Sequence, residues 1–182
     1  MALLAEQLVD EWLNRLGFFT VRGIKEGVNE IDLLAIRPNE QGIGLDAWHV
    51  EVQISFNPTA YISQLSDAQM KELGARSRSS AKQRPLDMLE GSVADWVDKK
   101  FKQKKKIGTR EKRWPGQQWH FVLVHARTKH AEELELIRKN GVQLIPFIDV
   151  LSALADGTDM RGQTGTDIVD IIGYYTKERA LK

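Results

Sequence analysis

Two apolar stretches of this chain carry acidic or amide side chains at every second position. In EIDLLAI these are Glu30 and Asp32, and in WHVEVQI they are Glu51 and Gln53. Alternation with a period of two is typical of β-strands, whose successive side chains point to opposite faces of a sheet. An ionised carboxylate is costly to bury unless a partner compensates its charge. The two stretches therefore predict two strands that bring a compensated acidic site into an apolar sheet.

The rest of the chain is predicted to alternate between helices and strands. At about 100° per residue, Leu8, Trp12 and their neighbours form one apolar arc with Glu6 at its rim, which indicates an amphipathic helix ending at Gly17. A short loop favours antiparallel pairing of the second and third strands, and the last strand–helix–strand order predicts a crossover with parallel pairing. The expected elements are a helix at 2–16, strands at 18–24, 30–36, 48–54 and 119–125, a helix at 130–140, and a strand from 142 that runs into a short helix.

The 182 residues contain no convincing linker, so we expect a single domain spanning residues 1–182. Residues 60–106 are expected to be helical in two pieces, with a break around 77–85. The last expected helix covers about 165–180.

The composition limits the class of protein. Hydrophobic residues make up 42% and charged residues 28% of the chain, which is typical of a globular protein. No apolar run approaches the roughly 18 residues of a membrane span, and the first residues include acids where a signal peptide needs basic residues. A cytoplasmic protein without a membrane partner is therefore expected. The absence of cysteine excludes disulfides and thiolate metal sites.

Positive charge is concentrated in one segment, KKFKQKKKIGTREKR, residues 99–113. Such a segment on an otherwise acidic protein favours contact with a polyanion such as nucleic acid, although a solvated loop explains it equally well. The candidate nucleic-acid-binding residues are Lys99, Lys100, Lys102, Lys104, Lys105, Lys106, Arg110, Lys112 and Arg113.

Strand alternation also predicts how the acids are oriented. Asp32 should face away from Ile31, Leu33 and Ala35, and Glu51 should face away from the valines beside it. If the two strands are neighbours, the Asp32 and Glu51 carboxylates converge and repel each other unless a cation lies between them. A hard divalent ion such as Mg²⁺ would compensate both. Each carboxylate taken alone is equally explained by an ion pair with a Lys or Arg of a neighbouring helix.

An amphipathic helix with an inward-leaning Glu, a short strand, the sequence I-D-L-L-A, a hairpin and the sequence V-E-V-Q together resemble the core of the PD-(D/E)XK nuclease superfamily, the restriction-endonuclease-like fold. The resemblance covers residues 2–55 and is compatible with 119–155. It implies an α/β fold with a central mixed sheet of about five strands in αβββαβ order, flanked by helices. Residues of about 60–115 would then form a helical and basic insertion.

The resemblance also assigns roles to residues of the site. Asp32, Glu51 and the backbone carbonyl of Val52 match the family's metal ligands for Mg²⁺ or Mn²⁺, and Glu6 matches a glutamate of the first helix. Gln53 stands where the family usually has a lysine; an amide can orient water but supplies no positive charge. The missing cation is sought in the helix expected after the third strand, where the sequence offers Lys71, Arg76, Arg78 and Lys82 without singling one out.

The resemblance implies a Mg²⁺-dependent endonuclease that hydrolyses phosphodiester bonds in DNA, with Glu6, Asp32, Glu51 and Gln53 as candidate catalytic residues. The alternative is a catalytically weak or inactive module of the same fold that binds nucleic acid or protein. A third interpretation is an interaction protein whose acids are paired internally. Many nucleases of this fold act as dimers, so a homodimer is compatible with the resemblance. The four histidines, His49, His120, His125 and His130, show no metal-ligand spacing and are expected at strand ends or on the surface.

Overall fold

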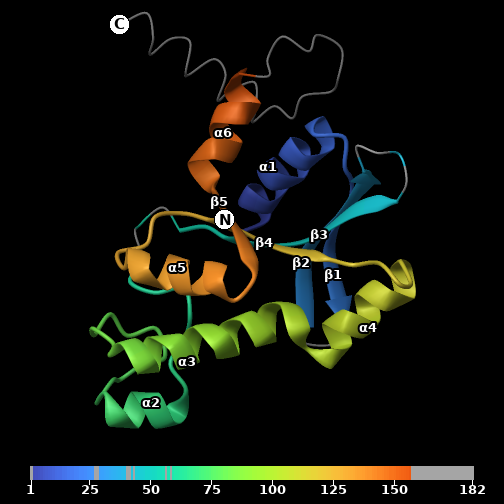
Figure 1. Cartoon of the computed structure of the whole chain (residues 1–182). Helices are drawn as coiled ribbons and strands as arrows, with labels where there is room; N and C mark the ends of the chain where they lie inside the picture. Colours follow the sequence, from blue (N-terminus) through green and yellow to red (C-terminus); the bar gives the residue numbers. More distant parts are fainter. Residues whose placement is uncertain are drawn as a thin grey trace, which may run out of the picture.

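The computed structural model of the protein describes residues 2–26, 29–39, 42, 44–55, 57 and 59–156. Helices and strands follow one another largely in the expected order (Figure 1). The strands are β1 (Phe19–Glu26), β2 (Asn29–Pro38), β3 (Leu45–Gln53), β4 (His120–His125) and β5 (Val142–Pro146). The helices are α1 (Ala2–Arg15), α2 (Asp67–Glu72), α3 (Leu86–Val97), the π-helical turn η1 (Asp98–Lys102), α4 (Lys104–Arg113), α5 (Ala131–Lys139) and α6 (Phe147–Asp156). The helix predicted at about 165–180 lies outside the described residues.

The five strands form one mixed sheet in the order β1-β2-β3-β4-β5. β1, β2 and β3 are antiparallel neighbours, whereas β3 pairs with β4 and β4 with β5 in parallel. The predicted antiparallel pairing of the second and third strands is confirmed, as is the parallel pairing across the crossover helix α5. The α/β class with a mixed sheet flanked by helices is therefore correct.

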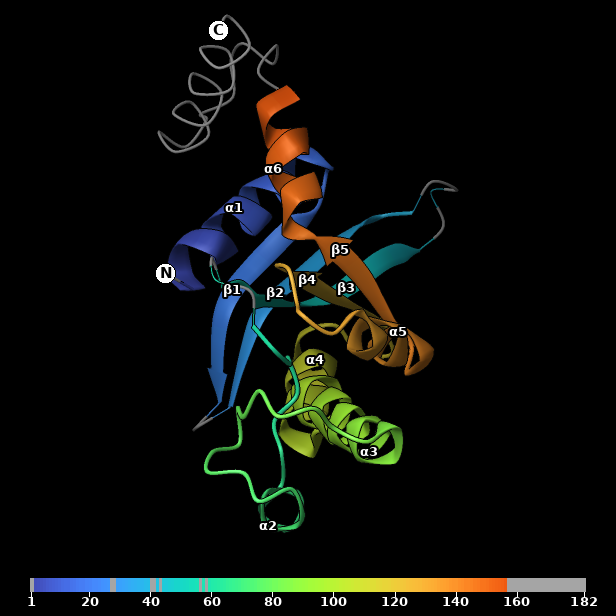
Figure 2. The ribbon, with the colours of Figure 1, turned by 90° about the vertical axis from the view of Figure 1, so that its left-hand side faces the viewer.

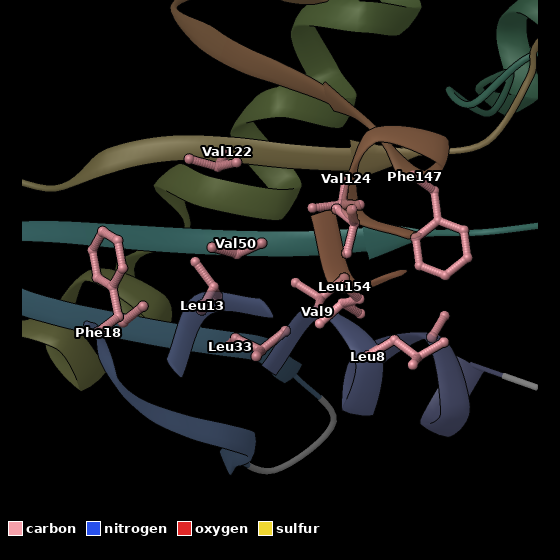
Figure 3. Close-up of a cluster of buried hydrophobic side chains, with 13 residues drawn as sticks. Leu8, Val9, Leu13, Phe18, Leu33, Val50, Val122, Val124, Phe147 and Leu154 are labelled. Carbon is pink, nitrogen blue, oxygen red and sulfur yellow. The ribbon is translucent and has the colours of Figure 1, made fainter. Parts of the chain in front are cut away.

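Helices α1 and α6 cover one face of the sheet, and α3, α4 and α5 lie on the other (Figures 1 and 2). On the first face, buried side chains from both helices meet those of the three central strands, as Figure 3 shows. Leu13 of α1, Leu33 of β2 and Val50 of β3 have no solvent exposure. Burying a side chain of this size contributes about 1.5–3 kcal/mol, so this layer fixes the position of α1 and of Glu6 on it.

The opposite face holds a second apolar cluster around Phe101, Leu123 and Ile137, contributed by η1, β4 and α5. A smaller third cluster joins Ile24, Ile31 and Leu34 to Trp114 and Trp119. Both indoles therefore pack against the protein interior. Together these clusters attach the basic segment of the chain to the sheet.

Strict alternation along β2 fails at one point. Leu33 packs in the α1 and α6 layer as expected, but Ile31 packs with Leu34 on the opposite face. Between the pairs Arg22↔Leu33 and Ile24↔Ile31, the β1–β2 ladder skips the position of Asp32. Gly23 lies there on β1 with φ of +60°, a backbone conformation that favours glycine. The β1–β2 pairing is therefore interrupted at Asp32, and Ile31 and Leu33 on either side of it pack in different clusters.

The first of the two helical pieces predicted in residues 60–106 is wrong except at α2. A capping box between Ser66 and Gln69 starts that helix, and Gly74, with φ of +59°, follows its end. Before α2 the backbone is bound elsewhere: the buried Glu133 carboxylate accepts hydrogen bonds from the amides of Ile62 and Ser63. A side chain 70 residues away thus replaces helical hydrogen bonding, which local sequence does not reveal.

Candidate active site

The acidic site lies where β2 and β3 separate. Their last pair toward this end of the sheet is Leu33↔Val50, and beyond it β2 pairs with β1 while β3 pairs with β4. Asp32 and Glu51 are the next residue of each strand, so they lie at the base of this fork. The Val52 amide donates its hydrogen bond to Asp32 Oδ2 at 2.8 Å. Where the pairing of β2 and β3 ends, the Asp32 side chain thus replaces a backbone carbonyl as the acceptor for the Val52 amide.

Glu51 is buried with 1% exposure and is bound by three side chains. Lys100 Nζ lies 2.7 Å from Oε2, Lys106 Nζ lies 2.6 Å from Oε1, and His49 Nε2 lies 3.1 Å from Oε1. Burial alone would raise the pKa of Glu51, but the hydrogen bond from His49 and the two ammonium groups lower it to about 2. Glu51 therefore stays ionised at neutral pH.

His49 links Glu51 to a further cation. Arg110 Nη1 lies 2.6 Å from His49 Nδ1 and also donates to the Phe101 carbonyl at 2.8 Å. A guanidinium can only donate, so Nδ1 must accept and the ring proton resides on Nε2, where it points to Glu51. Burial lowers the pKa of His49 to about 4, so the contact with Glu51 is a hydrogen bond from a neutral imidazole.

Asp32 has the opposite electrostatic environment. Burial first, and then the nearby charge of Glu51, raise its pKa to about 7, although the Val52 hydrogen bond and Lys100 act in the opposite direction. Burial and the charges of Glu30 and Glu51 likewise raise the pKa of Glu6. The lysines therefore compensate Glu51, while the side of the fork nearest Asp32 and Glu6 retains an excess of negative charge.

The predicted residues are thus only partly brought together. Glu6, Asp32 and Glu51 act on one another electrostatically. Gln53 is exposed at the end of β3, two residues beyond Glu51 on the same face, and lines a pocket together with Lys100. Glu30 is exposed but contributes to the field at Glu6.

None of the four cations sought after the third strand contacts Glu51 in the described structure. Lys71 and Arg76 are exposed, and Lys82 donates to the carbonyls of Leu73 and Gly74. Arg78 lines the pocket that contains Gln53. The cations that contact Glu51 are instead Lys106 of α4 and Lys100 of the π-helical turn η1, a kind of turn that is frequent at functional sites.

The basic segment is divided between two environments. Lys106 and Arg110 are buried, with 4% and 6% exposure, and Lys100 is half-buried against Glu51. These three point into the protein and serve the acidic site. The exposed basic residues of the segment are Lys99, Lys102, Lys104, Lys105, Lys112 and Arg113.

His49 is the site residue that the sequence analysis missed, because it is neither at a strand end nor on the surface. The signal was present: His49 precedes Glu51 by two residues in one strand, so both side chains share a face. His125 is also buried, whereas His120 is exposed and His130 is half-buried. The contacts of Lys100 and Lys106 had no local signal, since they join residues 49 and 55 positions apart.

The oxygen atoms at the fork are ligands of the type that a hard cation prefers, but a lysine already compensates the charge of one of the two carboxylates. Among the described residues, no cluster of three or more His, Asp or Glu side chains has the arrangement of a metal site. Mg²⁺ is usually held by only one or two carboxylates with waters and phosphate oxygens, and Asp32, Glu51 and the Val52 carbonyl offer oxygen ligands of this kind. The raised pKa of Asp32 marks a carboxylate that a cation would stabilise. Lys100 Nζ contacts Glu51 Oε2, so on metal binding Lys100 would have to share that oxygen with the metal ion or move away.

Within the described part of the chain, no helix is both long and apolar enough to cross a bilayer. Comparisons with protein-family models, with curated proteins and with solved structures find no significant match to this chain.

Proposed function

We propose that this protein is a divalent-metal-dependent nuclease that hydrolyses phosphodiester bonds in DNA, with Asp32 and Glu51 at the centre of its site. The observation that carries the proposal is the fork itself. Two carboxylates from neighbouring strands lie just beyond the last β2–β3 pair, and the charge of Glu51 raises the pKa of Asp32. Keeping both acids close has a cost that a bound cation would remove.

In this proposal Asp32, Glu51 and the Val52 carbonyl hold Mg²⁺ or Mn²⁺, with Glu6 at the rim. The metal would lower the pKa of a bound water and stabilise negative charge on the phosphate. Lys100 supplies the positive charge that Gln53 lacks, because its ammonium contacts Glu51 and the residue also lines the pocket beside it. The Gln53 amide, which is exposed at the same pocket, is placed to orient water or a phosphate oxygen.

The exposed half of the basic segment provides the DNA contact. Lys102 lies on η1 together with Lys100, and Lys104 and Lys105 lie at the start of α4. Lysines on a phosphate backbone release counterions, so binding should weaken steeply as salt rises. The cationic segment would thereby hold DNA while its buried half supports the acidic site.

Cleavage of plasmid and labelled oligonucleotides in Mg²⁺, Mn²⁺ or EDTA tests this function. We expect cleavage with either metal, none in EDTA, and a loss of about 100-fold or more in Asp32→Asn. That variant keeps the shape and the acceptor for the Val52 amide, so it should fold. Asp87→Asn, the same change at an exposed position of α3, should cleave normally. Absence of cleavage by the wild type with both metals, or full activity of Asp32→Asn, would contradict the proposal.

One observation favours a second candidate, a module that binds DNA without cleaving it. Both Glu51 oxygens already have lysine partners, and Arg110 adds a third cation at His49, so the positive charges here outnumber this one ionised carboxylate. An anion such as phosphate can be attracted to that excess without a metal. This candidate expects DNA binding that is the same in EDTA and in Mg²⁺, is retained by Asp32→Asn, and is never followed by cleavage.

A further inference from the structure

A pocket of about 510 Å³ adjoins the fork at the end of β3. Gln53 from β3 and Lys100 from η1 both line it, and Lys100 is the residue whose Nζ contacts Glu51. The pocket and the acidic site therefore share a wall. Its volume is within the range of about 300–1,000 Å³ that is typical of small-molecule sites.

The inner part of the pocket is apolar. Ile62, Leu65 and Trp96 line it and are buried to between 1% and 7% exposure. Trp96 is held by an edge-on contact with Phe101, with ring centroids 6.0 Å apart. A rigid apolar floor of this kind suits a flat ring and offers little to a flexible polar chain.

The rim of the pocket is polar and available. Gln53, Gln64, Asp95 and Lys99 line it and are exposed. Within the described residues, their side chains take part in no hydrogen bond or ion pair. The two amides can donate to and accept from the edge of a ring held on the floor, and the carboxylate can accept from it.

Cations outnumber acids around this pocket. Arg78, Lys99 and Lys100 line it, against Asp95 as the one acidic residue among its described lining. Arg78 is tied to Asp67 in an ion pair that is largely exposed and therefore weak. An apolar floor, a hydrogen-bonding rim and a surplus of positive charge match the three parts of a nucleotide: the faces of its base, the edge of its base and its phosphate.

We propose that this pocket takes one unpaired nucleotide next to the phosphate at the fork. The inference rests on the proposed function and names its substrate class. A base inside a duplex is stacked and paired, so it reaches a pocket only when it is unpaired or extruded from the helix. The substrate is therefore single-stranded DNA, or a duplex with an unpaired nucleotide, and fully paired DNA enters poorly.

Binding measured in EDTA tests the pocket apart from cleavage. The probes are three fluorescent DNAs of equal length: a single strand, a blunt duplex, and a duplex with one bulged nucleotide, each followed by anisotropy. We expect the wild type to bind the single strand and the bulge about tenfold more tightly than the blunt duplex. Arg78→Ala and Gln64→Ala should each reduce that preference about threefold or more.

Arg76→Ala is the matched control, because Arg76 is an exposed arginine two residues from Arg78 that does not line the pocket. It should keep the preference. Equal affinity of the wild type for all three DNAs would overturn the proposal, as would an equal loss in Arg76→Ala and Arg78→Ala. Asp32→Asn should retain the preference, because Asp32 does not line the pocket. If the wild type prefers unpaired DNA but never cleaves it, the proposed nuclease function is wrong and the proposed nucleotide pocket still stands.

Discussion

The inward and the exposed residues of the basic segment are the same kinds of side chain, lysine and arginine, in opposite surroundings. Lys100, Lys106 and Arg110 point inward and are bound to Glu51 or His49. Lys104 and Lys105, on the same helix α4 as Lys106, are exposed. A charged side chain that is buried against a partner affects the stability of the fold, while an exposed one affects mainly what approaches from solution. A cationic run in a sequence is therefore not a single surface.

The largest expected effect is on stability, from removing a buried cation. Lys106→Met leaves Glu51 with less compensation in a buried site and should lower the free energy of unfolding by about 3–5 kcal/mol. Lys105→Met, the same change at the neighbouring exposed residue, should alter it by about 0.5 kcal/mol or less. Urea unfolding of the two variants measures the difference. Equal effects would show that the two halves of the segment do not differ as described.

The next prediction asks whether Lys100, Lys106 and Arg110 compensate the charge of Asp32 as they compensate that of Glu51. The pKa of Asp32 is raised from 3.8 to about 7, so the folded protein holds this proton between those values while the unfolded chain has lost it. Stability therefore falls as pH rises from about 4 to 7, and the full cost is present above pH 7. Without metal, Asp32→Asn should be more stable than the wild type by about 2–4 kcal/mol at pH 8.

The same variant should show no such advantage at pH 4, where Asp32 is protonated in the folded protein. Thermal unfolding at both pH values measures it. Added Mg²⁺ should raise the unfolding temperature of the wild type at pH 8 and leave that of Asp32→Asn unchanged. A variant that is less stable than the wild type at pH 8 would mean that the lysines already satisfy Asp32.

A smaller effect concerns the neutral histidine that joins Arg110 to Glu51. The pKa of His49 is lowered to about 4, so the unfolded chain gains a proton near pH 6.5 while the folded protein does not. Stability is thus lost as pH falls from about 6.5 to 4. His49→Gln keeps a donor for Glu51 but does not titrate, and should remove about 2 kcal/mol of this loss. The same pH dependence in His49→Gln and in the wild type would contradict this role of His49.

Substitutions of the exposed lysines of the segment should have the smallest effect on stability and should instead change the affinity for DNA. Replacing Lys104 and Lys105 by Gln should change the unfolding free energy by about 0.5 kcal/mol or less. If both contact phosphates, the slope of log affinity against log salt for duplex DNA should decrease by about 0.9 per lysine. Lys139→Gln, an exposed lysine of α5 outside the segment, should leave that slope unchanged. An unaltered slope in the double variant would remove α4 from the DNA contact.

Much of the central sheet followed from local pattern. Period-two alternation located β2 and β3, and the helical arc of α1 placed Glu6 at its rim, because these signals depend on neighbours in the chain. The interruption of strand pairing at Asp32 was not predicted, since it also involves Gly23 of the adjacent strand. The segment before α2 was also assigned wrongly, because Glu133 binds its amides from the crossover helix.

By itself, the sequence determined the strands that carry Asp32 and Glu51 and the face of β3 that Glu51 shares with Gln53, because strand geometry is written in adjacent residues. Tertiary structure alone decided which charges meet these acids. Lys100 and Lys106 reach Glu51 across 49 and 55 residues, and Arg110 reaches His49 across 61. Electrostatic partners are set by distance in space and by burial, which a charge count along the chain does not contain.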